Sequence, residues 1–559
     1  MTSSPFPGQQ RNNSLWTAFL FVLAVAPGFS AEKQFARSLS LGRDEKSRKP
    51  NIVLILADDL GFADAQVCAG ALSLCNTTDM RTPQIKELVS ESVVLERMYV
   101  APVCSPSRAQ IMTGRYAFRY GLQNLVVQLG FNYALNTNET LLPEDLRKLG
   151  YATHLVGKWH LGYTRWEEAP TFRGFDSFFG LYSGEQAYFS KETTEGQPYV
   201  TSDVPFRGFD FRDDVRPNCG ADCSKVRKDL TGIYNPPLFT QRGSDIIQSH
   251  DFEESPLFMY FAMQSVHSPQ EVPESYVKPF ADPSRPDMYI KDADRRKYAG
   301  MVSAMDESVG GVIDALKAKG VYEDTVIVFL SDNGGETSTF VGDSYIGQNN
   351  SPLRGDKATL YEGGMRSLSF IKAPGLAAGK YGGLLSEVDL YATLLEAAGA
   401  SMPERPGFPS DSISFWGHLQ GFQGGPKRQE LVYLQDTTNH PEFSSPATWS
   451  GTIVTDKWKL IVGEPGATFD YFPIPDPDPT PGDIVNIKCY PGCLFDLEVD
   501  GIESTDVYSA HVDVAGKLLE RIKFYNESYV KAYWPNYPGC DWNDEADPRH
   551  FSGVWTPYR

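Results

Sequence analysis

Short apolar runs that end abruptly in polar residues recur along the first 331 residues of the chain. They lie at 51–57, 151–156, 257–263 and 325–331. A continuous run of this length, without alternation of apolar and polar positions, is typical of a parallel strand that is covered on both faces. The pattern predicts an open α/β sheet of mainly parallel strands that lies between helices.

Helical periodicity separates the strand candidates. Apolar residues recur at intervals of three and four positions between Tyr298 and Leu316, and Asp389 is placed to cap a helix over 390–398. The segment 186–242 is irregular and rich in Gly, Pro and Asp. We interpret that segment as a surface excursion rather than a domain.

The composition changes at the Gly-rich segment 420–426. Beyond it lie three short strand candidates, at 431–434, 451–455 and 458–462. A Pro-rich loop follows at 473–481, and then a helix with an apolar face from Val514 to Tyr529. We therefore expect a large α/β domain over 50–425 and a smaller α+β domain over 426–559.

Each of the four apolar runs delivers polar residues at its carboxyl end: Asp58 and Asp59, Lys158 and His160, His267, and Asp332 and Asn333. Ligands of open α/β sheets bind beyond the carboxyl ends of the strands, so these residues predict one shared site. The two pairs of oxygen donors suit Ca²⁺ or Mg²⁺ rather than Zn²⁺. Either pair alone has another explanation, a helix cap or a turn, but their matching placement favours a metal site.

Cys104 follows an apolar run at 92–103, and Pro106 stands where the first turn of a helix is expected. This places Cys104 at a helix N-terminus, where free N–H groups and the helix dipole stabilise an anion and where Arg108 and Arg115 add positive charge. A buried structural thiol is the alternative.

The N-terminus indicates export. Arg11, an apolar run at 15–26 and small residues at 28–30 are typical of a signal peptide over 1–30, followed by a flexible lead-in at 31–49. An N-terminal anchor is the alternative, although the run is short for a membrane span. No later run is long enough to span a membrane, so we expect a soluble protein of the secretory pathway, either lysosomal or extracellular.

Export permits disulfides and glycans. Among the eight cysteines, Cys219 with Cys223 and Cys489 with Cys493 are close enough to bridge, and Cys68 with Cys75 is a third candidate. Cys540 is left over. The glycosylation candidates are Asn76, Asn138, Asn349 and Asn526.

The formal net charge of −20 argues against nucleic acid as a partner, because no basic stripe is present to neutralise phosphates. Such a surface also repels a long polyanion at neutral pH. Near pH 5 much of this charge is lost as carboxylates titrate.

The pattern Cys104-Ser-Pro106-Ser-Arg108, followed by Met112-Thr-Gly-Arg115, resembles the signature of type I sulfatases. Lys357 ends the string Pro-Leu-Arg-Gly-Asp-Lys at 352–357, which is a further candidate motif. From residue 51 to the C-terminus the chain is similar to arylsulfatase B-type enzymes, the N-acetylgalactosamine-4-sulfatase relatives. The matching strings lie at 57–61, 156–162, 264–269, 298–302, 332–335 and 553–555.

This resemblance implies an alkaline-phosphatase-like α/β sandwich and a calcium-dependent sulfatase. A formylglycine-generating enzyme would oxidise Cys104 to formylglycine, whose hydrate attacks sulfur. By the resemblance, Asp58, Asp59, Asp332 and Asn333 bind one Ca²⁺ ion together with the modified Cys104. Arg108 and Lys158 then hold the hydrate, while Lys158, His267 and Lys357 hold the sulfate. His267 protonates the leaving alcohol, and His160 bonds the second hydroxyl of the hydrate.

The expected substrate is a sulfated carbohydrate or an aryl sulfate ester, and the resemblance points to an exo-acting enzyme on N-acetylgalactosamine 4-sulfate. Two segments depart from the close relatives: 126–134 lacks the cysteines of their loop, and 186–223 fits poorly. Two other functions remain open, a phosphonate or phosphodiester hydrolase on the same scaffold and a sulfoglycan-binding protein in which Cys104 is not oxidised.

Overall fold

The computed structural model describes residues 49–559 except 68–78, 125, 196–205, 340–341, 423, 437–448, 467, 470–483, 486–488 and 533–543. Several predictions concern residues outside this description: the signal peptide, Cys68, Cys75, Asn76, the Pro-rich loop at 473–481 and Cys540. Among the described residues, no helix is long and apolar enough to cross a membrane.

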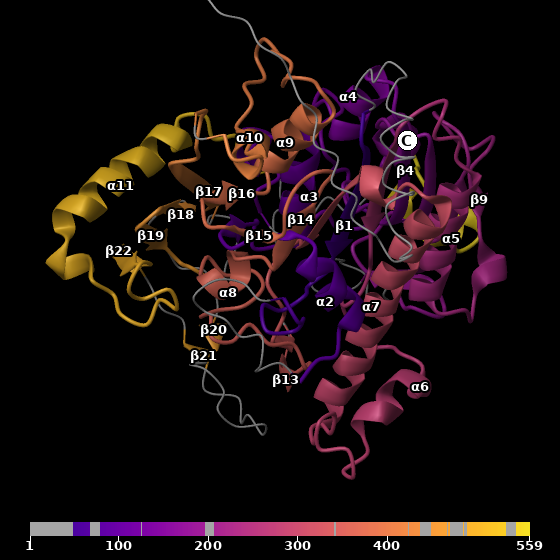
Figure 1. Ribbon diagram of the computed structural model, residues 1–559, viewed down its shortest axis with the longest axis horizontal. Coiled ribbons are helices and arrows are strands. Elements are labelled where there is room, and N and C mark those ends of the chain that lie inside the picture. Colours follow the sequence, from indigo (N-terminus) through magenta and orange to yellow (C-terminus); the bar gives the residue numbers. More distant parts are fainter. Residues whose placement is uncertain are drawn as a thin grey trace, which may run out of the picture. The chain divides into compact units, whose positions relative to one another are not determined.

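The four apolar runs form adjacent parallel strands at the centre of a ten-stranded sheet (Figure 1). Their order is β11 (Thr325–Ser331), β1 (Asn51–Ala57), β10 (Leu257–Ala262) and β4 (Ala152–Lys158), each in parallel register with its neighbours. Every residue of β1, β10 and β11 is buried. The predicted parallel strands are therefore confirmed.

Shorter strands extend this core on both sides. On one side β4 pairs in parallel with β5 (Ser177–Leu181), and the antiparallel strands β8 (Arg212–Asp214) and β9 (Lys225–Val226) complete that edge. On the other side lie β14 (Ser369–Lys372), antiparallel to β11, then β2 (Val93–Leu95) and β15 (Gly379–Tyr381). The sheet is mixed and mainly parallel, as predicted.

The interpretation of 186–242 as a surface excursion is wrong in part. Besides β8 and β9, this segment contains the first residues of α5 (Asn235–Ser249), and Phe211 is fully buried. The polar sequence of β8 concealed the strand, because Asp213 is buried by ion pairs with Arg227 and Arg242 rather than by apolar packing. The ion pairs connect residues 14 and 29 positions apart, a separation that no local pattern reveals.

Helices cover both faces of the sheet, because the side chains of β1 alternate between two apolar clusters. Val53, Ile55 and Ala57 pack in one cluster with α2 (Pro83–Ser90), α5 and the long α7 (Ala293–Lys319). Ile52, Leu54 and Leu56 pack in the other with α3 (Cys104–Thr113), α4 (Leu142–Lys148) and α9 (Asp389–Ala397). The predicted sandwich of a sheet between helices is confirmed.

A smaller antiparallel sheet follows near the C-terminus, as expected. Its order is β17 (Glu430–Asp436), β18 (Trp449–Thr455), β19 (Trp458–Gly463) and β22 (Cys489–Asp496), and α11 (Val512–Asn526) contacts three of these strands. The helix ends before Tyr529, three residues earlier than the apolar pattern. Cys489 pairs with Cys493 and Cys219 with Cys223, in agreement with the spacing argument.

Asp389 does not cap α9, contrary to the prediction. It is the first residue of the helix, and its carboxylate instead accepts hydrogen bonds from the backbone of Ser386 and Ile413 and pairs with Arg428 at 2.5 Å. A buried arginine competes for this carboxylate more strongly than a helix N–H group does, because the ionised pair forms charge-assisted hydrogen bonds.

Glu387 connects α3 to the loop before it and to β17. Its fully buried carboxyl accepts hydrogen bonds from the Ala101 backbone at 2.7 Å, from the Gln110 amide, from Ser386 Oγ at 2.8 Å and from the Tyr433 hydroxyl at 2.6 Å. Burial raises the pKa of Glu387 to about 7. The loop before Cys104 is therefore fixed by an acid that prefers its neutral form.

We predict that Glu387→Gln reduces the loss of stability on raising the pH. Unfolded glutamate ionises near pH 4.5, whereas folded Glu387 keeps its proton to about pH 7, so wild-type stability falls across this interval, by about 3 kcal/mol. Glutamine mimics the neutral acid and removes this contribution. Melting temperatures between pH 5 and 8 test this prediction. The melting temperature of Glu387→Gln should rise relative to that of wild type as the pH increases, whereas that of the control Glu254→Gln, which changes an exposed acid, should not. Parallel curves for Glu387→Gln and wild type would contradict the prediction.

Candidate active site

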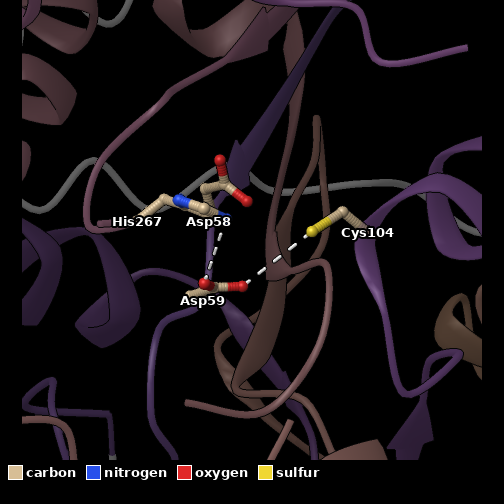
Figure 2. Close-up of side chains that lie close together, drawn as sticks. All are labelled: Asp58, Asp59, Cys104 and His267. Atoms are coloured by element: carbon tan, nitrogen blue, oxygen red, sulfur yellow. Dashed lines mark hydrogen bonds and ion pairs between the residues drawn. The ribbon is translucent and has the colours of Figure 1, made fainter. Parts of the chain in front are cut away.

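The polar residues that end the central strands meet at one edge of the sheet. Asp58 and Asp59 follow β1, Asp332 follows β11, and His267 lies beyond β10. Ligand atoms of Asp58, Asp59, Cys104 and His267 all lie within 4.8 Å of one another, and all four residues are buried. Figure 2 shows the Cys104 sulfur and the His267 ring both directed at the Asp59 carboxylate.

Cys104 is the first residue of α3, as predicted from Pro106. The helix is buried along its whole length and ends at Gly114, whose φ of 65° is the left-handed conformation that favours glycine. Cys104 Sγ lies 4.0 Å from Asp59 Oδ1. Burial raises the pKa of the Cys104 thiol well above its usual range, even though Lys158 and Lys357 oppose the shift. The unmodified side chain is therefore a protonated thiol and a poor nucleophile.

Each carboxylate of the cluster is paired with a predicted cationic residue. Lys158 Nζ lies 2.7 Å and 2.9 Å from the two oxygens of Asp58, and Lys357 Nζ lies 2.6 Å from Asp59 Oδ2. Arg108 Nη2 lies 2.7 Å from Asp332 Oδ2. These contacts place six predicted residues in one network of alternating charge.

The carboxylates respond differently to this network. Burial favours the neutral form of Asp59, but Lys357, His267 and Lys158 outweigh it and hold the pKa of Asp59 below its usual range. Burial and the negative charge of Asp58 raise the pKa of Asp332 to about 6, against the opposing effect of Arg108. A further positive charge at this edge would favour ionisation of both acids.

Asn333 completes the oxygen donors. Its amide Nδ2 donates to Asp59 Oδ1 at 2.7 Å and to the Gly334 carbonyl at 2.8 Å. Its Oδ1 is buried and has no hydrogen-bond partner in the part of the chain that the structure describes. A buried amide oxygen rarely stays unpaired, and one beside three carboxylates is a ligand that a hard divalent cation prefers. The residues present therefore fit a bound Ca²⁺ ion.

The two predicted histidines flank the cluster in different states. His160 Nε2 donates to the Val127 carbonyl at 3.2 Å, while its buried Nδ1 has no hydrogen-bond partner among the described residues. Burial, together with Lys158 and Arg108, lowers the pKa of His160 well below its usual range. His160 is thus a neutral imidazole with a free lone pair on Nδ1.

His267 presents its other nitrogen to the site. Its Nδ1 donates to the Ser268 carbonyl at 2.7 Å, and its Nε2 lies 3.2 Å from Lys357 Nζ and 3.5 Å from Asp59 Oδ2. Burial and Lys357 lower the pKa of His267. Nε2 is therefore the atom that can exchange a proton with a ligand between His267 and Lys357.

Arg115 does not contribute charge to the site, contrary to the prediction. Its guanidinium pairs with the buried Glu139 and donates to the Pro409 carbonyl at 3.0 Å. An acid 24 residues away in the sequence thus neutralises this arginine. The divergent segment 126–134 does reach the site, because Val127 accepts the bond from His160.

The sequence did not single out Gly184 and Glu185, which lie in the loop at 182–191 just before the divergent segment 186–223. A Cβ atom on Gly184 would lie 2.4 Å from the His160 ring, so only glycine fits there. The next residue, Glu185, brings Oε2 to 3.9 Å from His267 Nδ1, and Tyr188 OH donates to the His267 carbonyl at 2.8 Å. The one available signal was the run at 177–181, which also ends in polar residues at the carboxyl end of a central strand.

The chain is similar to known proteins over most of its length. The model of the family described as Sulfatase matches residues 50–400. Arylsulfatase J of Mus musculus is 32% identical over 528 residues, which cover 91% of this chain and 80% of that protein. N-acetylgalactosamine-6-sulfatase of Mus musculus is 30% identical over 364 residues, 63% of each chain. The solved structure of Ps i-CgsB in complex with k-i-k-neocarrahexaose has a TM-score of 0.68 and 25% identity, and the match covers 90% of this chain and 98% of that one.

The fold and the buried charged cluster at the edge of the sheet thus define a protein of the alkaline-phosphatase-like class. Within this class, the chain belongs to the sulfatase family. The predicted resemblance to type I sulfatases is confirmed at this level. The relatives named above do not single out a 4-sulfatase.

We predict that Asp332→Asn weakens calcium binding at least tenfold, because one anionic ligand of a hard cation is lost while the side-chain shape is kept. Isothermal titration of the metal-free protein with Ca²⁺ measures this. Asp64→Asn is the matched control, since Asp64 is also fully buried and pairs with an arginine, Arg295, at 2.6 Å. Equal calcium affinity of wild type and Asp332→Asn would contradict the assignment of this ligand.

Proposed function

We propose that the protein is a calcium-dependent sulfatase that hydrolyses sulfate monoesters of sugars, and that Cys104 acts after conversion to formylglycine. The observation that carries this proposal is the position of Cys104. It lies at the start of a buried helix, 4.0 Å from Asp59, inside a cluster whose Asn333 Oδ1 has no partner among the described residues. A formylglycine-generating enzyme would be a partner during maturation.

The protonated thiol itself supports the need for modification. Burial keeps Cys104 protonated, so a thiolate nucleophile is not available at neutral pH. A formylglycine at residue 104 would supply the nucleophilic oxygen that the thiol does not. A Ca²⁺ ion held by Asp58, Asp59, Asp332 and Asn333 would supply positive charge to the ester oxygens.

The remaining charges of the site suit a sulfate monoester. Such an ester is an anion that resists attack, and negative charge grows on the leaving oxygen as the bond to sulfur breaks. Lys158, which is fully buried, pairs with Asp58, and Lys357, whose side chain is 9% exposed, pairs with Asp59, so both provide fixed ammonium groups. Arg108, held by Asp332, adds a third positive charge next to Cys104.

The two histidines divide the proton transfers. The Ser268 carbonyl fixes Nδ1–H of His267, so Nε2 faces the ligand and can protonate the departing alcohol. His160 Nδ1, neutral and unpaired among the described residues, can accept a proton from a hydroxyl on residue 104. The reaction consumes one water and yields an alcohol and inorganic sulfate.

The proposed substrate is a sulfated sugar at a chain end, with N-acetylgalactosamine 4-sulfate as the leading candidate. The relative named N-acetylgalactosamine-6-sulfatase supports the sugar but favours a different sulfate position. The net charge of −20 disfavours a long polyanion lying across the surface, because like-charge repulsion grows with the docked length. We further propose a secretory-pathway location, lysosomal or extracellular, where such sugars occur.

Peptide mass spectrometry of the segment that contains Cys104 tests the proposal. Protein from its native source should show loss of the thiol mass and gain of the aldehyde at residue 104, together with sulfate release from sugar sulfates. A thiol alone, with binding of sulfated sugars but no release of sulfate, would instead identify a binding protein. Faster turnover of phosphonate or phosphodiester substrates than of sulfate esters would identify the other hydrolase.

His267 gives a prediction that depends on the leaving group. Because burial and Lys357 lower its pKa, protonated His267 accumulates only below its usual titration range, so sugar sulfate hydrolysis should speed up from pH 7.5 to pH 5. His267→Ala should slow release from a sugar sulfate about 100-fold more than release from an aryl sulfate, whose phenolate needs less protonation. Equal losses for both esters would show that His267 only binds the sulfate.

A further inference from the structure

The loop at 182–191 crosses the site between the two histidines. Gly184 packs against the His160 ring, and Glu185 follows with its carboxylate 3.9 Å from His267 Nδ1. The loop comes directly after β5, at the same edge of the sheet as the metal cluster. Glu185 is therefore placed at the rim of the site, beside His267.

This loop is held in one conformation by buried partners. The Asp210 carboxylate accepts hydrogen bonds from the backbone of Tyr182 at 3.1 Å and of Ser183 at 2.8 Å. Ser183 Oγ donates to the Glu185 carbonyl at 2.9 Å.

The far end of the loop is anchored in the same way. The Tyr188 N–H group donates to Glu271 at 2.7 Å, and the buried Lys191 Nζ donates to the Tyr188 carbonyl at 2.8 Å. Because the backbone on both sides of Glu185 is fixed, binding to its carboxylate costs the conformational entropy of the side chain alone.

Glu185 differs from the other acids of the site in its exposure. Its side chain is 54% exposed, whereas those of Asp58, Asp59 and Asp332 are fully buried. It lies on the Nδ1 side of His267, away from Lys357 and Asp59, which contact Nε2. With the ester oxygen at Nε2, a sugar that extends toward solvent brings its neighbouring substituents to the rim of the site, where Glu185 is a half-exposed acid.

We propose that Glu185 determines specificity by reading the substituent next to the scissile sulfate. An ionised carboxylate accepts hydrogen bonds from an uncharged hydroxyl or amide N–H group, and it repels a second sulfate or a carboxylate at the same place. The inference rests on the proposed function and deepens it: the substrate class is a sugar with one sulfate and uncharged neighbours, rather than a disulfated sugar.

Competing substrates test this directly. The measured quantity is kcat/KM for N-acetylgalactosamine 4-sulfate, the 6-sulfate and the 4,6-disulfate. For each variant, the ratio of kcat/KM for the faster monosulfate to kcat/KM for the disulfate gives the preference. Wild type should prefer the monosulfate at least tenfold. Glu185→Gln should reduce this ratio about tenfold, and Glu185→Lys should reverse the preference. Glu254→Gln, which changes an exposed acid ahead of β10, should leave the ratio as in wild type.

The ratio separates a specificity role from a structural one, because damage to the loop slows both substrates alike. Raising the salt concentration should also lower the preference of wild type, since a half-exposed charge is screened. A ratio that is the same in wild type, Glu185→Gln and Glu185→Lys would overturn the inference while the proposed function stands. If wild type released sulfate from none of the three sugars, the proposed function would be overturned, and the inference with it.

Discussion

The burial of three carboxylates side by side at one edge of the sheet is the constraint on which the rest of the site depends. Parallel pairing sets Ala57 of β1 opposite Ser331 of β11, so Asp58 and Asp332, one residue further along, are forced together. Like charges in a low-dielectric interior repel strongly unless cations compensate them. Lys158, Lys357 and Arg108 supply that compensation, and their geometry in turn defines where an anionic substrate and a metal can bind.

The compensating groups come from separate elements, so the layers around the sheet must be held in register. Arg108 lies on α3, which Glu387 ties to the loop before it and to β17 of the smaller sheet. Lys158 is the last residue of β4, a central strand buried on both faces. Core packing and buried polar bonds thus fix the distances that the chemistry requires, and the half-exposed Glu185 is left to set specificity.

The central strands and the oxygen donors could be predicted because buried parallel strands have continuous apolar sequences and the polar residues at their ends stand out. β8 could not, since Asp213 is buried by ion pairs with distant arginines. Asp389 and Arg115 do not have their predicted roles for the same reason, because each forms an ion pair with a residue that is distant in the sequence. Only the apolar run at 177–181 pointed toward Glu185, because its place beside His267 arises only when β5 and β10 join one sheet through β4.

The most direct measurement of the central claim is a crystal structure of the protein grown with Ca²⁺. We predict one ion with oxygen ligands from Asp58, Asp59, Asp332 and Asn333 at about 2.3–2.6 Å, and with residue 104 as a further oxygen ligand. The Asn333 Oδ1 atom would then have its partner. An empty cluster, in which Lys158 and Lys357 still pair directly with Asp58 and Asp59 at saturating calcium, would contradict the claim that this edge of the sheet is a metal site.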